Sequence, residues 1–153
     1  MILFILISIV GLDQVTKYLI QRSFALGDSL PLISGVLHIT YHRNTGAAFG
    51  LFVGNTLFLA ALSVIFIVVT ARYLMRRPKD APLAWALTLI LSGAVGNVID
   101  RLRLGYVVDF IDFRVWPIFN VADSAITCGV VLILWDLAAS LRRSRHAAEG
   151  PRA

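Results

Sequence analysis

Two aspartates, Asp109 in VVDF (107–110) and Asp123 in FNVADS (119–124), lie at the edges of apolar segments of the chain. A carboxylate in the middle of a bilayer costs at least about 2.5–3.5 kcal/mol on insertion scales, so an acid beside a membrane span usually faces a polar cavity or a partner. Two carboxylates that meet in a poorly solvated place share one proton, because they cannot both ionise side by side. One of them can then activate a water while the other protonates a leaving group. The pair is therefore the first candidate for a hydrolytic site.

Each of the two acids also has a structural interpretation. Asp123 falls near the start of an expected helix, where the helix dipole favours an anion. Asp109 could be a solvated acid that faces Arg103 or Arg114. Pro117 lies between the two aspartates, so they can meet only if the chain folds back.

Two further acids need an explanation in so apolar a chain. Asp13 precedes Lys17 by four residues, which is the spacing of an ion pair on one helix face, and we interpret this pair as structural. Asp100 is followed by Arg101, and we interpret these two as a structural or substrate-positioning pair. Asparagines stand three residues before Asp100 and Asp123, at positions where a helical turn lets an amide orient a carboxylate; they are Asn97 and Asn120.

The elements that must position these residues are membrane spans. The chain has 153 residues, 58% of them hydrophobic, and a mean hydropathy of +0.81, which is far too apolar for an ordinary soluble core. Four stretches have about the 17–25 apolar residues that a helix needs to cross a bilayer, namely 2–20, 56–74, 83–99 and 121–139. The first lacks a basic leader and an A-x-A-like cleavage site, so we expect a retained span.

The distribution of basic residues predicts the orientation. Arginines and lysines follow the second and fourth stretches without comparable acids, so these ends, and with them both termini, are predicted to be cytoplasmic. The net charge of +5 then lies mainly in cytoplasmic segments that face anionic lipid, and no nucleic-acid partner is implied. We divide the chain into one membrane domain, 1–141, and a basic cytoplasmic tail, 142–153, which we expect to be disordered.

Two external connections complete the predicted fold. Residues 36–42 alternate in the manner of a short half-buried strand, whose free edge could hold an extended peptide or merely cap the bundle. Residues 100–118 mix apolar and charged residues, which favours a segment lying at the membrane interface. The sequence thus predicts an all-α membrane protein: a four-transmembrane-helix bundle with a small extracytoplasmic β-element and an interfacial segment.

Other chemistries have little support in the sequence. His38 and His42 would share one face of a strand, but no third ligand is evident nearby, so we do not expect a metal site. Cys128, the only cysteine, falls within the fourth span, where we expect it to pack as an apolar side chain. Neither a G-x-S-x-G motif nor a recognisable Ser/Lys pair supports serine chemistry.

Five motifs occur in one order along nearly the whole chain: LDQVTK (12–17), NTGAAFG (44–50), GNVIDR (96–101), GYVVDFIDF (105–113) and FNVADSAI (119–126). Together they resemble lipoprotein signal peptidase (signal peptidase II), the bacterial intramembrane aspartyl protease family. The resemblance implies a catalytic dyad of Asp109 and Asp123. It further implies residues that support the site or contact substrate: Asp13, Lys17, Asn44, Gly46, Asn97, Asp100, Arg101, Asn120 and Ala122.

The resemblance also implies an activity and a location. The activity is removal of the signal peptide from a prolipoprotein, immediately before its diacylglyceryl-modified cysteine, with no metal or other cofactor. The location is the bacterial cytoplasmic (inner) membrane, with the active site near the extracytoplasmic face and with membrane lipid around a chain that we expect to be monomeric. We expect the acyl chains to stay in the bilayer while the scissile peptide runs beside the 36–42 strand.

Two other classes of function compete with this hypothesis. A small proton-coupled transporter or channel subunit would use the four aspartates as relay carboxylates distributed through the membrane depth. Only Asp13 is near the middle of a span in sequence, which favours a site close to the surface. A structural assembly factor would tolerate the loss of either Asp109 or Asp123.

Overall fold

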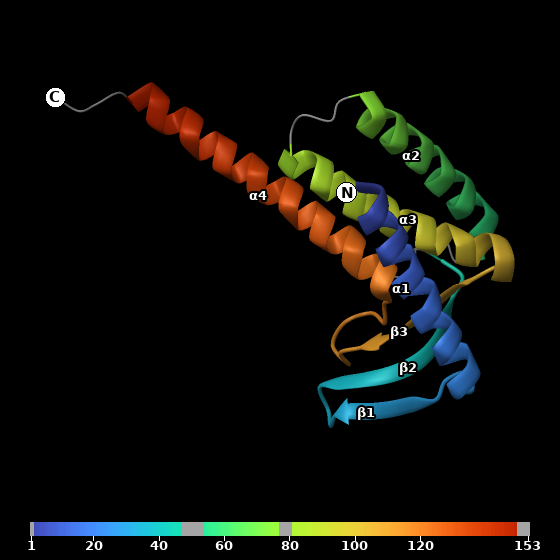
Figure 1. Cartoon of the computed structure of the whole chain (residues 1–153). Helices are drawn as coiled ribbons and strands as arrows, with labels where there is room; N and C mark the ends of the chain where they lie inside the picture. The colour runs from blue at the N-terminus through green and yellow to red at the C-terminus, as the bar shows by residue number, and fades with distance from the viewer. Residues whose placement is uncertain (1, 47–53, 77–80, 150–153) are drawn as a thin grey trace.

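The computed structural model describes residues 2–46, 54–76 and 81–149, and the side chains of Ala81 and of 145–149 are left out of the description. Four long helices dominate it (Figure 1): α1 (Ile2–Ser23), α2 (Thr56–Arg76), α3 (Ala81–Leu104) and α4 (Val121–Glu149). Each contains an apolar window long enough to cross a membrane, since 20 helical residues span about 30 Å. The prediction of four spans is confirmed, with helices that extend beyond the predicted stretches.

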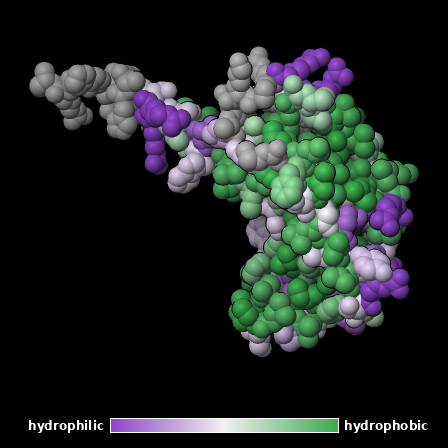
Figure 2. Space-filling view, viewed as in Figure 1, coloured by the Kyte–Doolittle hydropathy of each residue, from purple (hydrophilic) through white to green (hydrophobic). Residues whose placement is uncertain are grey.

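Helix α3 is the inner helix of the bundle. Its apolar window is 61% buried, against 11–22% for the windows of the other three helices, whose outer surface is largely apolar (Figure 2). Small residues let the neighbours approach it closely. A Cβ added at Gly96 would lie 2.6 Å from the Oδ2 atom of Asp13, and one added at Gly93 would collide with the Ala122 carbonyl. The contacts of α3 with α1 and α4 therefore depend on these two glycines.

A three-stranded antiparallel sheet lies beyond one end of the bundle (Figure 1). Its order is β1 (Ser29–Ile33), β2 (Leu37–Asn44) and β3 (Val107–Asp112). The sheet packs against the last turns of α1 through a cluster formed by Ile20, Tyr41, Val108 and Phe110. The predicted strand at 36–42 is confirmed, because β2 covers nearly the same residues.

The expectation that this strand has a free edge is wrong over most of its length. Strand β2 is central: residues 37–40 pair with β1, and residues between 38 and 44 pair with β3. On the β1 side, the main-chain hydrogen bonds of β2 continue as far as Tyr41, which bonds to Gly27 and Asp28. Only the end of β2 beyond Tyr41 extends past its first partner.

The segment 100–118, which was expected to lie at the membrane interface, contains the end of α3 and the whole of β3. Its first residues complete α3, and Gly105, with a φ of 79°, then turns the chain into β3. Residues 107–110 of β3 are all buried, so both faces of the strand are covered and the alternation that marks a half-buried strand is absent.

The tail 142–153 was expected to be disordered. Residues 142–149 are instead helical, because α4 continues to Glu149. Arginine, alanine and glutamate make up most of residues 142–149. These residues are strong helix formers and extend the helix beyond its apolar window. Residues 150–153 lie outside the described part of the chain, as do residues 47–50 of the NTGAAFG motif.

Candidate active site

The Asp109 side chain is enclosed between β3 and the start of α4. It is 1% exposed, and each carboxylate oxygen accepts one amide hydrogen bond: Oδ1 from Asn120 Nδ2 at 2.7 Å and Oδ2 from Asn44 Nδ2 at 2.9 Å. Burial raises the pKa of Asp109 to about 7, and the nearby charge of Asp123 acts in the same direction, against the two amide donors. Near neutral pH, this carboxyl group can therefore hold or release a proton.

Asp123 is fixed by the geometry that begins α4. Asn120 stands at the N-cap position, and its Oδ1 atom accepts a 2.9 Å hydrogen bond from the main-chain N–H of Asp123. The Oδ2 atom of Asp123 accepts a 3.3 Å hydrogen bond from the main-chain N–H of Asn120 in return. This reciprocal arrangement is a capping box, which here satisfies two N–H groups of the helix start. The same arrangement orients the Asp123 carboxylate.

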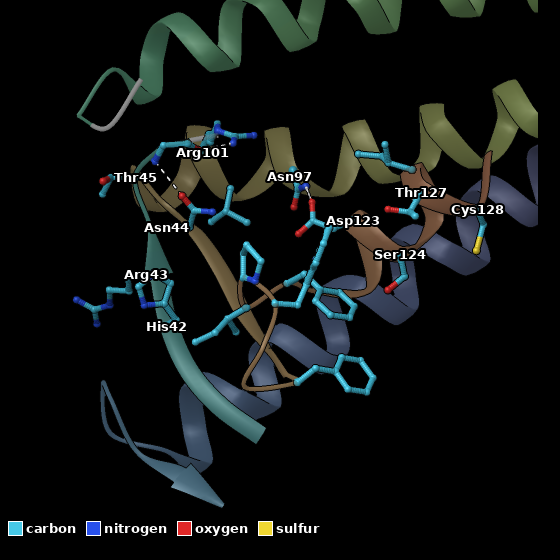
Figure 3. Close-up of a pocket in the computed structure, with 18 residues that line it drawn as sticks. His42, Arg43, Asn44, Thr45, Asn97, Arg101, Asp123, Ser124, Thr127 and Cys128 are labelled. Atoms are coloured by element: carbon cyan, nitrogen blue, oxygen red, sulfur yellow. Dashed lines mark hydrogen bonds between the residues drawn. The ribbon is translucent and has the colours of Figure 1, made fainter. Parts of the chain in front are cut away.

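A third amide connects the two carboxylates to α3. Asn97 Nδ2 donates to Asp123 Oδ1 at 2.8 Å, and Asn97 Oδ1 accepts from Asn120 Nδ2 at 3.2 Å. Figure 3 shows Asn97 on α3 and Asp123 on α4 pointing toward one another. One continuous set of hydrogen bonds thus runs from Asp109 through Asn120 and Asn97 to Asp123.

An ionic cluster lies behind these amides. The Lys17 ammonium is 2.9 Å from Asp13 Oδ2 and 3.0 Å from Asp100 Oδ2, so the predicted pairing of Asp13 with Lys17 is present. Asp13 Oδ1 also accepts from the main-chain N–H of Ala122 in the first turn of α4, at 2.9 Å. Asp13 therefore belongs to the same end of the bundle as the other acids, although it falls near the middle of α1 in sequence.

Asp100 and Arg101 act separately in this geometry. Asp100 pairs with Lys17, and its Oδ2 atom accepts from the main-chain N–H of Val108 at 3.0 Å, which holds β3 against α3. Arg101 Nη2 instead donates to the Gly46 carbonyl at 3.0 Å. This bond holds the end of β2, and with it Asn44, against α3.

A cavity of about 1200 Å³ opens beside this network. Its wall is made by the end of β2, the last turns of α3, the segment that follows β3 and the first turns of α4 (Figure 3). Asp123, Asn44, Asn97, Arg101 and Gly46 line it, whereas Asp109 lies behind Asn44 and Asn120. A water or a peptide in this cavity can therefore reach Asp123 directly.

All the site residues predicted from the sequence gather at one end of the bundle, but two other expectations need revision. Cys128 is exposed and lines the cavity, so it does not pack in the interior of the bundle as expected. Gln14 was missed, although its amide donates to Asp13, to the Gly96 carbonyl and to Asp100. Its signal was available in the sequence, since it is an amide directly beside an acid within an apolar span.

The paired histidines of β2 do not converge on a site. The Nδ1 atom of His38 is 3.1 Å from Ser29 Oγ on β1, whereas His42 lines the cavity. Within the described ranges, no group of three or more His, Cys, Asp or Glu side chains is arranged to hold a metal ion.

Comparison with known proteins identifies the family of this chain. The family model described as signal peptidase (SPase) II matches residues 5–139. Among curated relatives, the lipoprotein signal peptidase of Moorella thermoacetica is 44% identical over 136 residues, covering 88% of this chain and 91% of that protein. The lipoprotein signal peptidase of Brevibacillus brevis is 47% identical over 140 residues, covering 90% and 94%.

Solved structures agree with these relatives. A structure described as a bacterial membrane enzyme superposes with a TM-score of 0.84 at 39% identity, covering 92% of this chain and 88% of that one. The chain therefore belongs to the signal peptidase II family. It is a protease, and its four apolar helices make it a multi-pass protein of the bacterial membrane.

Proposed function

We propose that this protein is an aspartic endopeptidase that removes signal peptides from prolipoproteins immediately N-terminal to the diacylglyceryl-modified cysteine, using Asp109 and Asp123 to activate water. The observation that carries the proposal is the shared hydrogen-bond network: Asn120 binds both carboxylates, and Asp123 faces a large cavity. The names of the relatives supply the class of substrate.

The environments of the two aspartates favour different roles. Asp123 lines the cavity and accepts hydrogen bonds at both carboxylate oxygens, so its ionised form can take a proton from a water in the cavity. Asp109 is enclosed, and its raised pKa favours the protonated form. Because Asp123 faces the cavity and Asp109 does not, we assign Asp123 as the general base and Asp109 as the general acid in the first step.

The proposed reaction has two steps. In the first step, Asp123 takes a proton from water as the water oxygen bonds to the scissile carbonyl carbon. The peptide displaces the Asn44 amide from Asp109, and Asp109 gives its proton to the carbonyl oxygen. In the second, a hydroxyl of this tetrahedral diol returns a proton to Asp109, the C–N bond breaks, and the departing amine takes the proton held by Asp123. The dyad ends as it began, so no further reactant is required.

The shape of the cavity favours one direction of entry. The end of β2, His42 to Asn44, forms one wall, while the first turns of α4 form another. We propose that the scissile peptide lies extended along the end of β2, with the acyl chains left in the surrounding bilayer. This narrows the expected location beside the 36–42 strand to the end of β2 beyond Tyr41.

The charge distribution supports the orientation proposed from the sequence. Arg76 ends α2, and Arg142 and Arg143 lie in the last turns of α4. In an up-and-down bundle, these ends lie away from the sheet. Under the positive-inside rule, the termini are then cytoplasmic, and the sheet and the dyad lie at the extracytoplasmic face.

Purified protein tests the proposed activity directly. It should cleave a diacylglyceryl-modified prolipoprotein before the modified cysteine, and mass spectrometry should locate the new N-terminus there. The same prolipoprotein without its lipid is the matched control and should remain intact. Cleavage at another bond, or equal cleavage of both forms, would contradict the proposal.

A further inference from the structure

The Lys17 ammonium is buried, and each of its N–H groups has a hydrogen-bond acceptor. It is 2% exposed, and its three N–H donors have three acceptors: Asp13 Oδ2, Asp100 Oδ2 and Asn97 Oδ1, at 2.9, 3.0 and 3.0 Å. Ion pairing with the two acids needs only the first two contacts. The third is made to an amide that itself binds Asp123.

This third contact determines which way the Asn97 amide faces. Its Oδ1 atom accepts from Lys17 and from Asn120 Nδ2, which uses both of its lone pairs, so Nδ2 points at Asp123. In the flipped orientation, an NH₂ group would face two donors, and an amide oxygen would face the Asp123 carboxylate. Lys17 therefore disfavours the flipped orientation.

We propose that Lys17 is a positioning residue for the dyad: by holding the Asn97 amide in one orientation, it keeps Asp123 ionised and ready to accept a proton from water. This inference rests on the proposed function of the dyad. Lys17 does not line the cavity and acts on Asp123 through Asn97. If Asn97 flips, only protonated Asp123 can hydrogen-bond to it, and the general base is lost.

The charged and titratable groups around Asp109 and Asp123 come from α1, α3 and β2. Lys17 and Asp13 are on α1, Asp100 and Arg101 on α3, and His42 and Arg43 on β2. The charge of Lys17 lowers the pKa of Asp109, whereas the charge of Asp123 raises it. Removal of the ammonium is thus expected to favour protonation of the dyad as a whole.

A charge-matched pair of variants separates positioning from neutralisation. The cluster of Lys17, Asp13 and Asp100 carries a net charge of −1 when all three are ionised. Lys17→Met alone leaves two uncompensated acids, whereas Lys17→Met combined with Asp13→Asn restores −1 without restoring a donor to Asn97. Lys17→Gln combined with Asp13→Asn has the same charge and retains a neutral amide donor at this position. Arg103→Met is the control, because it removes an exposed cation from the last turn of α3, close to Asp100 in sequence.

The measurements are kcat, KM and the pH profile of kcat with a lipidated prolipoprotein, per amount of folded protein, together with the unfolding temperature. We expect Lys17→Met/Asp13→Asn to lose about 10²-fold in kcat, the size of effect that misplacement of a reacting group by about 1 Å can produce. KM should change little, and the acidic limb should move to higher pH. Lys17→Gln/Asp13→Asn should recover part of kcat, and Arg103→Met should match the wild type.

Two results would overturn the inference. One is a Lys17→Met/Asp13→Asn variant with the wild-type kcat and pH profile, which would leave Lys17 only a neutralising role. The other is an equal loss of kcat in Lys17→Met/Asp13→Asn and Lys17→Gln/Asp13→Asn at equal unfolding temperature. That result would show that a hydrogen-bond donor to Asn97 at position 17 has no effect on the dyad. In either case, the wild-type protein would still distinguish lipidated from unmodified substrate, so the proposed function would stand.

Discussion

Asn120 donates a 2.7 Å hydrogen bond from its side-chain amide to the Oδ1 atom of Asp109. The same asparagine caps α4, where it exchanges two hydrogen bonds with Asp123. One residue therefore ties a strand of the sheet to the first turn of a membrane helix and sets the relative placement of the two carboxylates. The local structure of a helix start and the geometry of the site depend on the same side chain.

Replacing Asn120 with alanine should damage both roles. Loss of an N-cap side chain costs about 0.5–2 kcal/mol, and the carboxylates of Asp109 and Asp123 each lose a constraint. We expect kcat to fall by about 10²-fold or more, with a lower unfolding temperature. Asn55→Ala, an exposed asparagine just before α2, is the matched control and should leave kcat unchanged. A wild-type kcat in Asn120→Ala would show that the dyad is held by other contacts.

The raised pKa of Asp109 predicts how stability depends on pH. Its value in the folded state, about 7, lies above the ordinary 3.8 of the side chain, so the folded protein binds this proton more tightly than the unfolded chain does. This contribution to stability is fully present below about pH 4 and is lost as pH rises through about 7. Asp109→Asn should flatten the pH dependence of the unfolding free energy between these values.

Denaturant unfolding at several pH values in detergent measures this effect. Asp28→Asn, at an exposed acid, should leave the pH dependence as in the wild type. If wild type and Asp109→Asn lose stability in parallel from pH 4 to 7, Asp109 does not hold the proton.

The pH profile of activity follows from the assigned roles. The active form has an ionised Asp123 and a protonated Asp109, so kcat/KM should decline as pH rises through about 7, the pKa of Asp109. The measured limb belongs to the coupled pair rather than to one residue. Initial rates with lipidated prolipoprotein between pH 5 and 9 test this. A kcat/KM that keeps rising across pH 7 to 9 would assign the proton elsewhere.

The close packing of α3 predicts an unequal effect of two glycine substitutions. A Cβ at Gly96 would lie 2.6 Å from Asp13 Oδ2, whereas a Cβ at Gly11 has nothing within 4 Å. Gly96→Ala should push Asp13 away from Lys17 and lower both the unfolding temperature and kcat. Gly11→Ala should be neutral or stabilising by up to about 1 kcal/mol, because alanine favours a helix interior. Equal behaviour of the two variants would contradict the close packing.

The elements that rest on strong local signals could be predicted from sequence. The four spans follow from hydropathy, and the Asp13–Lys17 pair follows from helical spacing. Strand β3 could not be predicted in this way, because burial of both faces removes its alternation. The free edge expected at 36–42 was wrong, because pairing with β3 joins segments far apart in the chain.

The sequence predicted a set of residues that the structure brings together at one end of the bundle, but it did not predict the hydrogen bonds that connect them. Spacing suggests that Asn120 can orient Asp123, and the capping box bears this out. No local pattern indicates that Asn120 also reaches Asp109, or that Lys17 reaches Asn97 from another helix. These contacts arise from the packing of α1, α3, β3 and α4 at one end of the bundle.

The most direct test of the proposed dyad is the initial rate at which Asp109→Asn and Asp123→Asn cleave a diacylglyceryl-modified prolipoprotein, with Asp28→Asn as the control. Each dyad variant should remain folded and lose about 10²–10⁴-fold in kcat, the usual contribution of a general acid or base, while the control cleaves at the wild-type rate. A wild-type rate in either dyad variant would contradict the mechanism.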